Sequence, residues 1–206
     1  MYLVRPPFLL KKFYPGLLWR VDTDKKIIYL SFDDGPHPDI TPWVLNELKQ
    51  RNIKAIFFCV GENVQRYPDV YARILAEGHF TGNHTYNHLN GWNTDSGKYL
   101  NNIAVCAQQV KSHFFRPPYG RLKKSQARRL RRNYKIIMWD VLSGDFDRNT
   151  TPAKCLDNTL KYSREGSIVV FHDSLKAKEN LYAVLPAYLD EMKARGYGFG
   201  LFSPGP

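Results

Sequence analysis

The chain has 206 residues, of which 43% are hydrophobic and 14% aromatic, so it is too apolar for a disordered chain and long enough for one large core. Thirty basic residues against nineteen acidic ones give a net charge of +11. No zinc-finger spacing and no aromatic-rich RNA-binding motif accompanies this charge, so the sequence predicts one basic globular domain that does not bind nucleic acid.

Residues 1–25 form an extension ahead of the first predicted strand. Its apolar stretches are interrupted by basic residues and prolines, so none reaches the ~18 residues of a membrane-spanning helix. No small-residue cleavage site follows an apolar run either, which favours a cytoplasmic protein. Phe8, Leu9 and Leu10, with lysines beside them, keep open a peripheral contact with an anionic membrane or lipopolysaccharide.

Predicted strands and helices alternate along the rest of the chain. Strands are expected at 26–32, 54–60, 79–83, 113–116, 135–140, 167–171 and 198–202, and helices at 41–51, 68–77, 95–111, 125–133, 152–163 and 180–195. Thr41 and Thr151 each precede a proline, as an N-cap does when proline takes the first helical position. Seven strands alternating with helices predict a single α/β domain with a parallel barrel.

Two adjacent carboxylates, Asp33 and Asp34, follow the first apolar strand, and Gly35 and Pro36 then end it. Taken alone, this segment is typical of a solvated turn. Two ionised carboxylates repel each other, so they share one site only when positive charge lies beside them, such as a metal bound to one and a cation paired with the other.

His84 and His88 lie four residues apart, a spacing that on a helical turn puts both imidazoles on one face within about 6 Å. Such a pair can bind one divalent cation, although solvated histidine pairs have the same spacing. Two imidazoles and one carboxylate leave coordination positions open, which is typical of a catalytic rather than a structural metal.

Three later strands also end on polar side chains. Arg116 precedes two prolines and can hold a carboxylate in bidentate geometry, Asp140 and Asp145 follow the strand at 135–140, and His172 ends the strand at 167–171. Because the carboxyl ends of parallel strands meet at one rim of an α/β barrel, the five segments predict one shared active site.

Taken in order, these segments resemble the polysaccharide deacetylases, the NodB-homology domain of carbohydrate esterase family four, from about Lys26 to Leu201. The resemblance implies a distorted (β/α)7, TIM-like barrel, with an N-terminal extension over 1–25 and the catalytic domain over 26–206. It also implies a metal-dependent hydrolase that removes N-acetyl groups from a hexosamine-containing glycan. Zn²⁺ is the first choice of metal, with Co²⁺ or Ni²⁺ as alternatives.

The resemblance also gives roles to nine residues: the catalytic base Asp33, its orienting partner Arg116 and the general acid His172; the metal ligands Asp34, His84 and His88; and, on the substrate side, Tyr119 as a backbone donor to the oxyanion, with Phe146 and Val170. In the fourth motif, the family's Asp-x-x-Asp-Trp, Leu142 replaces the first acid, which tunes the general acid, and Phe146 replaces the tryptophan. Either Asp140, Asp145 or Asp173 then keeps His172 protonated, or the pKa of His172 is lower than in relatives.

Two other functions stay open. An amidase acting on a small formamide or cyclic imide would use the same metal chemistry, whereas a non-catalytic protein that binds a glycan or an anionic surface would have no need of a base and an acid around a metal. The basic segment from Arg121 to Lys135 predicts an amphipathic helix whose basic face is either solvated or attracted to an anionic surface. The glycan and the oligomeric state are not specified by the sequence.

Overall fold

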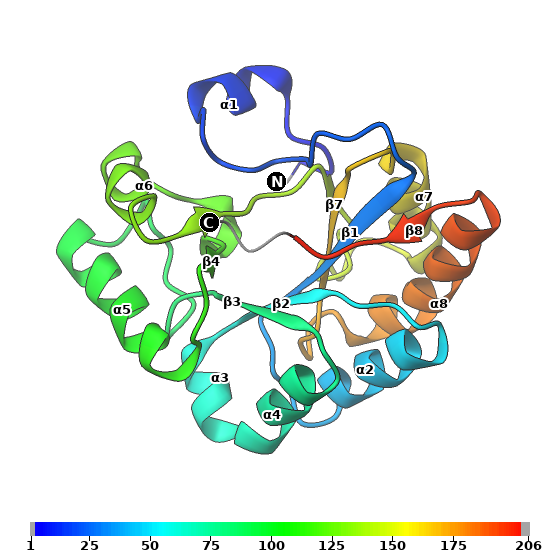
Figure 1. Ribbon diagram of the computed structural model, residues 1–206, viewed down its shortest axis with the longest axis horizontal. Coiled ribbons are helices and arrows are strands. Elements are labelled where there is room, and N and C mark those ends of the chain that lie inside the picture. Colours follow the sequence, from blue (N-terminus) through cyan, green and yellow to red (C-terminus); the bar gives the residue numbers. More distant parts are fainter. Residues whose placement is uncertain (1–2, 203–206) are drawn as a thin grey trace.

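The computed structural model describes residues 3–202 and contains a curled parallel sheet with helices around its outside (Figure 1). The strands are β1 (Ile27–Asp33), β2 (Ile56–Cys59), β3 (Phe80–Asn83), β4 (Phe114–Phe115), β5 (Lys135–Ile136), β6 (Val141–Leu142), β7 (Ile168–His172) and β8 (Gly198–Phe199). Their order is β5-β4-β3-β2-β1-β7-β6, with β8 paired to β1, and the pairs are parallel. The predicted parallel barrel is confirmed.

The helices around the sheet are α1 (Phe8–Phe13), α2 (Ile40–Gln50), α3 (Gly61–Arg66), α4 (Pro68–Ala76), α5 (Ser96–Gln109), α6 (Lys124–Leu130), α7 (Pro152–Tyr162) and α8 (Lys178–Ala194), with a 3₁₀ turn η1 (Pro118–Gly120). Thr151 caps α7 as predicted, because its hydroxyl accepts a hydrogen bond from the Lys154 N–H at 3.3 Å. The N-cap predicted at Thr41 is wrong. α2 already begins at Ile40, and the Thr41 hydroxyl instead donates to Asp173 at 2.5 Å.

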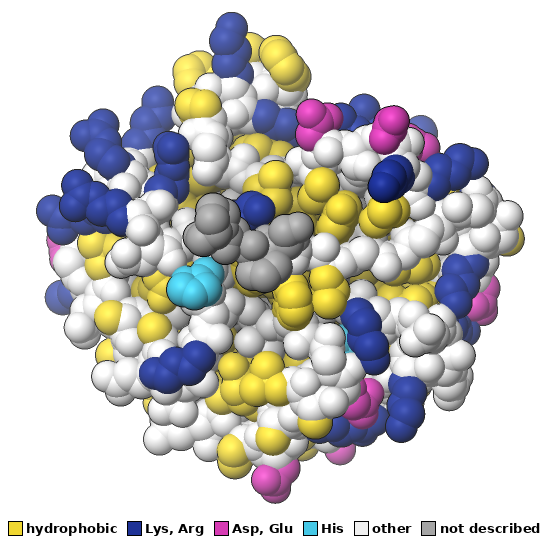
Figure 2. Space-filling view, viewed as in Figure 1, with side chains coloured by type: hydrophobic (Ala, Val, Ile, Leu, Met, Phe, Trp, Pro, Cys, Tyr) yellow, Lys and Arg dark blue, Asp and Glu magenta, His cyan; other side chains and the backbone are white. Residues whose placement is uncertain are grey.

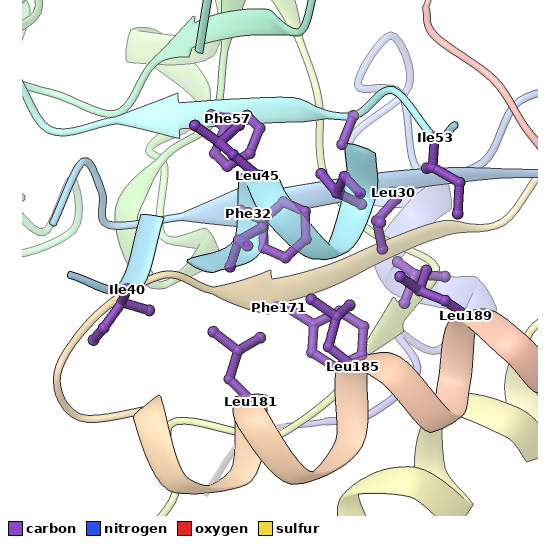
Figure 3. Packing of buried hydrophobic residues seen from close by; sticks show 14 of the residues in the cluster. Leu30, Phe32, Ile40, Leu45, Ile53, Phe57, Phe171, Leu181, Leu185 and Leu189 are labelled. Atoms are coloured by element: carbon purple, nitrogen blue, oxygen red, sulfur yellow. The ribbon is translucent and has the colours of Figure 1, made fainter. Parts of the chain in front are cut away.

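The main core lies between the central strands and helices α2 and α8 (Figure 3). Leu30 and Phe32 of β1 are buried in this core, and the Phe32 ring stacks on Phe57 of β2 at 5.0 Å. Because successive side chains of a strand point to opposite faces, Ser31 and Asp33 point into the barrel. Full burial of a phenylalanine is worth ~1.5–3 kcal/mol, so this packing fixes the orientation of β1 and hence of Asp33.

The single strand predicted at 135–140 is wrong, because the chain forms two short strands, β5 and β6, on opposite edges of the sheet. Between them, the carbonyls of Ile137 and Met138 turn to the Arg116 guanidinium, with N···O distances of 3.2 and 2.9 Å. Carbonyls used in this way are lost to strand pairing, so the sheet has eight strands rather than the predicted seven.

The N-terminal segment bonds to both edge strands. The Val4 carbonyl accepts from the Leu142 N–H of β6 at 2.8 Å, and Leu18 exchanges hydrogen bonds with Ile136 and Met138 at the β5 edge, at 2.9 and 2.7 Å. In Figure 1, α1 stands between α6 and α7, where no other helix of residues 3–202 covers the barrel. Of the extension predicted over 1–25, residues 3–25 therefore pack as part of the barrel wall. Within residues 3–202, no helix is long and apolar enough to cross a membrane.

Candidate active site

The predicted polar strand ends meet at one rim of the barrel, around a cavity of about 870 Å³. Asp33 ends β1 and His172 ends β7, and the two residues are direct neighbours in the strand register. His84 directly follows β3, and Arg116 directly follows β4. Asp33, Asp34, His84, His88 and His172 all line the cavity.

Arg116 is fully buried and holds Asp33 at an N···O distance of 2.6 Å. The same nitrogen, Nη1, also bonds the Ser31 hydroxyl at 2.9 Å, and the guanidinium lies over the Phe58 ring at 4.1 Å. The predicted bidentate geometry is wrong, because Nε and Nη2 bond the carbonyls between β5 and β6. Burial lowers the pKa of Arg116 and the charge of Asp33 opposes that shift, so the two ions stabilise each other.

Asp34, His84 and His88 form the one group of potential metal ligands found among residues 3–202, with ligand atoms within 4.8 Å of one another. Asp34 Oδ1 lies 3.1 Å from His88 Nε2 and 3.7 Å from His84 Nε2. Although burial acts to raise the pKa of Asp34, the hydrogen bond with His88 and nearby positive charge lower it overall, so this carboxyl is ionised.

The tautomer of His84 fits a metal ligand. Its Nδ1 lies 2.8 Å from the Arg116 carbonyl, which can only accept, so Nδ1 carries the proton and Nε2 has a free lone pair. Burial lowers the pKa of His84 to about 4, which keeps the ring neutral. A lone pair that faces a carboxylate oxygen is repelled by it unless a cation lies between them, so these residues fit a divalent metal.

The two histidines are brought together by a bend, and the predicted helical turn is wrong. Thr85 and His88 have φ values of +63° and +55°, in the left-handed region, and the two imidazole centroids lie 5.0 Å apart. Side chains take the place of helical carbonyls here: Asn83 accepts from the Thr85 N–H at 2.9 Å, and Asn102 accepts from the Tyr86 N–H at 2.8 Å.

His172 is paired with Asp145, one of the three acids that the sequence left open. Its Nδ1 lies 2.7 Å from Asp145 Oδ1, and its backbone N–H donates to Oδ2 at 2.7 Å. Burial acts to lower the pKa of His172, but the charge of Asp145 and the hydrogen bond to it raise the pKa to about 9. Asp140 instead binds Lys11, and Asp173 accepts from Thr41. Of the two alternatives for His172, the structure therefore supports a carboxylate partner, Asp145, and not a pKa below that of relatives.

Asp173 holds the turn that carries the two carboxylates, a role that the sequence did not reveal. It accepts a hydrogen bond from the Gly35 N–H at 3.0 Å, and its own N–H donates to the Asp33 carbonyl at 3.1 Å. Burial raises the pKa of Asp173 to about 7. A Cβ atom at Gly35 would lie 2.0 Å from Asp173 Oδ2, so the turn requires glycine at this position.

Two of the three predicted substrate-side residues line the cavity. Tyr119 does so with φ at +60°, and its hydroxyl lies 3.1 Å from His88 Nδ1. Phe146 also lines it and packs edge-on against His172 at 4.8 Å. Val170 is fully buried and is not among the lining residues; its register partner on β6, Leu142, lines the cavity in its place.

Several further lining residues, Trp92, Trp139 and Leu175 among them, were not singled out from the sequence. They lie outside the motifs, in segments without regular secondary structure. A large apolar residue in such a segment gives no local sign of where it packs, so only the tertiary structure identifies these positions.

Comparisons with known proteins give one consistent result. The family model described as "Polysaccharide deacetylase" matches residues 20–136. A peptidoglycan-N-acetylglucosamine deacetylase of Bacillus cereus is 35% identical over 188 residues, which cover 88% of each chain. The Listeria monocytogenes deacetylase PgdA is 33% identical over 87% of this chain, but the match spans only 38% of that protein.

A crystal structure supports the same grouping. It is the Bc1960 peptidoglycan N-acetylglucosamine deacetylase in complex with 4-naphthalen-1-yl-N-oxidanyl-benzamide, which is 30% identical to this chain. The two structures superpose with a TM-score of 0.85 over 95% of this chain and 94% of that one. Almost the whole of this chain therefore has a counterpart in that barrel.

Proposed function

The chain belongs to the polysaccharide deacetylase family, and on this premise we propose that it is a metal-dependent hydrolase that removes N-acetyl groups from a hexosamine-containing glycan. The observation that carries the proposal is that three sets of polar residues with different partners lie around one cavity. Asp33 is held by a buried arginine, Asp34 faces two imidazoles, and His172 is paired with a buried carboxylate.

Asp34, His84 and His88 would hold the metal, and two imidazoles with one carboxylate favour Zn²⁺, with Co²⁺ or Ni²⁺ as alternatives. When bound, such an ion supplies Lewis-acid chemistry, lowering the pKa of water from 15.7 to about 7 and polarising the amide carbonyl. The neutral tautomer of His84, fixed by the Arg116 carbonyl, keeps its Nε2 lone pair available for this ion.

Asp33 would act as the general base that takes a proton from the attacking water. A base must be held toward the water from which it takes the proton, and the buried guanidinium of Arg116, 2.6 Å away, orients this carboxylate. The turn anchored by Asp173 holds Asp33 at the cavity while Asp34 faces the histidines. Neighbouring carboxylates can thus have different roles.

His172 would protonate the leaving amine, which departs poorly as an anion. A pKa of about 9 keeps this imidazole protonated at neutral pH, and Asp145 fixes Nδ1 so that the opposite ring nitrogen is available to the substrate. The backbone N–H of Tyr119 would bond the oxyanion, an interaction worth ~3–4 kcal/mol in comparable sites. Phe146 would pack beside the sugar while holding the imidazole of His172.

The test of this function is release of acetate from N-acetylated glycans by the zinc-loaded protein. Chito-oligosaccharides and peptidoglycan should yield one free amine for each acetate, whereas O-acetylated xylan would yield acetate without amine. If none of the three glycans released acetate but the protein hydrolysed a cyclic imide or a formamide, it would instead be an amidase that acts on small molecules. Binding of glycans without any hydrolysis would make the protein a binding module.

A further inference from the structure

The positive charge of the protein is concentrated in two segments that contain no acidic residue. Residues 1–21 and 96–139 together have fifteen basic residues, whereas the rest of the chain has fifteen basic and nineteen acidic ones. The two segments are in contact: the Lys124 ammonium lies 5.5 Å above the Phe13 ring, and Arg131 bonds the Pro15 carbonyl at 3.2 Å. Figure 2 shows basic side chains over α6 and on α1 beside it.

Exposed apolar side chains gather in the same region. Of the eight large apolar side chains that are exposed among residues 3–202, three belong to α1 and four line the active-site cavity. On α1, Phe8, Leu9 and Phe13 are 77%, 65% and 62% exposed. A short helix with outward-facing phenylalanine and leucine beside lysines has the composition of a segment that lies in a membrane interface.

The active-site cavity extends from the metal ligands to the inner side of α1, because Leu10 and Tyr14 line it together with His84 and His88. The part near α1 is bordered mainly by apolar side chains: the aliphatic Leu3, Pro6, Leu10, Leu17 and Leu142, with the rings of Tyr14 and Trp19. Sugar hydroxyls need hydrogen-bond partners, which aliphatic side chains do not offer. This part of the cavity therefore suits a hydrocarbon better than another sugar ring.

α1 is held at this place by buried contacts. The Lys11 ammonium binds the fully buried Asp140 at 2.7 Å, and the Tyr14 hydroxyl donates to the Leu122 carbonyl at 3.0 Å. These bonds fix the inner side of the helix against the barrel while Phe8, Leu9 and Phe13 face outward. A membrane bound to the outer side of α1 would thus lie next to the mouth of the cavity.

We propose that the protein works at the surface of an anionic membrane on a hexosamine carried by a lipid: α1 lies in the headgroup layer, and the aliphatic part of the cavity takes the first carbons of the lipid chain. This inference rests on the deacetylase function proposed above and names its substrate class. The acid-free segments around α1 match the negative charge of such a membrane, which a second copy of this basic chain does not offer.

The membrane contact is tested with vesicles of phosphatidylcholine alone or mixed with phosphatidylglycerol. The wild type should sediment with the anionic vesicles and be released by added salt. The triple variant Phe8→Ser, Leu9→Ser, Phe13→Ser should bind about 100-fold more weakly. Leu75→Ser, which removes the one exposed large apolar side chain of the described residues that lies outside this region, is the matched control and should bind as the wild type does.

The substrate class is tested with alkyl glycosides of N-acetylated chitotriose, from methyl to dodecyl, below the concentration at which they form micelles. For the wild type, kcat/KM should rise by about fourfold for each methylene that enters the cavity. Leu10→Asn, which places a polar group on the inner side of α1, should flatten this dependence on chain length.

The outcomes separate this inference from the proposed function. Equal kcat/KM for the methyl and dodecyl glycosides would overturn the lipid-linked substrate and leave the deacetylase function in place. No acetate from either glycoside, with vesicle binding intact, would overturn the deacetylase function and this substrate class with it. The inference would also be overturned if the wild type did not bind vesicles and formed a dimer, and if the triple variant were a monomer. In that case α1 would be an interface between two copies of the chain.

Discussion

Asp33 and Asp34 are adjacent in the chain and have different partners, Arg116 for one and two histidines for the other. Replacement of each by asparagine should therefore have different effects. Asp33→Asn cannot accept a proton, so the rate should fall by about 10²–10⁴ while bound metal is retained. Asp34→Asn should instead contain less bound metal than the wild type, which elemental analysis after gel filtration would measure. Equal metal content and equal rates in the two variants would contradict the assignment.

The two histidines are predicted to bind the metal as a unit. The double variant His84→Ala, His88→Ala should contain less than a tenth of the zinc of the wild type, because one carboxylate alone is a weak site. His113→Ala, which removes an exposed histidine outside the cavity, is the control and should keep the full zinc content. Equal zinc in the double variant and the wild type would place the metal elsewhere.

The pairing of His172 with Asp145 predicts the alkaline side of the pH–rate profile. The acid form of His172 is lost as the pH rises through its pKa of about 9, so the rate should decline there. Asp145→Asn removes the charge that raises this pKa, and the alkaline limb should then move to lower pH. Asp147→Asn, which changes an acid two residues further on, should leave the limb in place. If the alkaline limb did not move in Asp145→Asn, His172 would not be the acid that titrates there.

At the same scale, the sequence predicted which residues act as base, metal ligands and acid, but it did not predict the contacts that hold them. His172 had three candidate partners, and only the fold shows that Asp145 lies beside it. Asp173 was predicted only as a candidate partner of His172, and its contact with Gly35 joins residues that are 138 positions apart in the sequence. Contacts of this length depend on how the strands pair, which no local pattern contains.

At the scale of elements, the loop between β1 and α2 depends on one glycine. Gly35→Ala should lower the free energy of unfolding by ~1–3 kcal/mol, because its Cβ would overlap the Asp173 carboxylate. It should also lower activity, since the same turn holds Asp33. Gly198→Ala is the matched control, with its nearest neighbour 3.9 Å away, and should be nearly neutral. Urea unfolding of both variants measures the difference, and equal stability would show that the loop can relax.

The elements themselves were predictable where hydrophobic periodicity is strong. The predicted helix at 152–163 corresponds to α7, and the predicted strand at 26–32 corresponds to β1. The errors lie where tertiary contacts override local preference. Arg116 draws two carbonyls out of the strand expected at 135–140, and side-chain amides support a bend at His84 where a helical turn was expected.

At the scale of the whole molecule, Asp140 joins the N-terminal segment to the barrel. Burial acts to raise the pKa of Asp140, but the hydrogen bond and charge of Lys11 lower it overall. A depressed pKa stabilises the fold at neutral pH, and that stabilisation is lost as the pH falls through the folded pKa. Asp140→Asn should therefore be less stable than the wild type at pH 7, by ~1.5–3 kcal/mol for a lost charge-assisted hydrogen bond.

The same comparison at lower pH checks the cause. Below the unfolded pKa of ~4, the wild-type carboxyl loses its advantage, and the difference between Asp140→Asn and the wild type should shrink. Thermal unfolding at several pH values measures this. A difference that stays constant down to pH 3 would mean that the shape of the side chain, rather than its charge, anchors the segment.

The hydrogen bonds that join Val4 to Leu142 and Leu18 to Ile136 also set the order in which the protein can be completed during synthesis. Residues near the start of the chain must wait for partners that are made more than a hundred residues later. Until then, both the apolar N-terminal segment and the edges of the sheet are uncovered, a state in which long-range β topologies are prone to aggregate. We expect nascent chains truncated before residue 135 to bind chaperones strongly, and release to follow once residue 142 has left the ribosome.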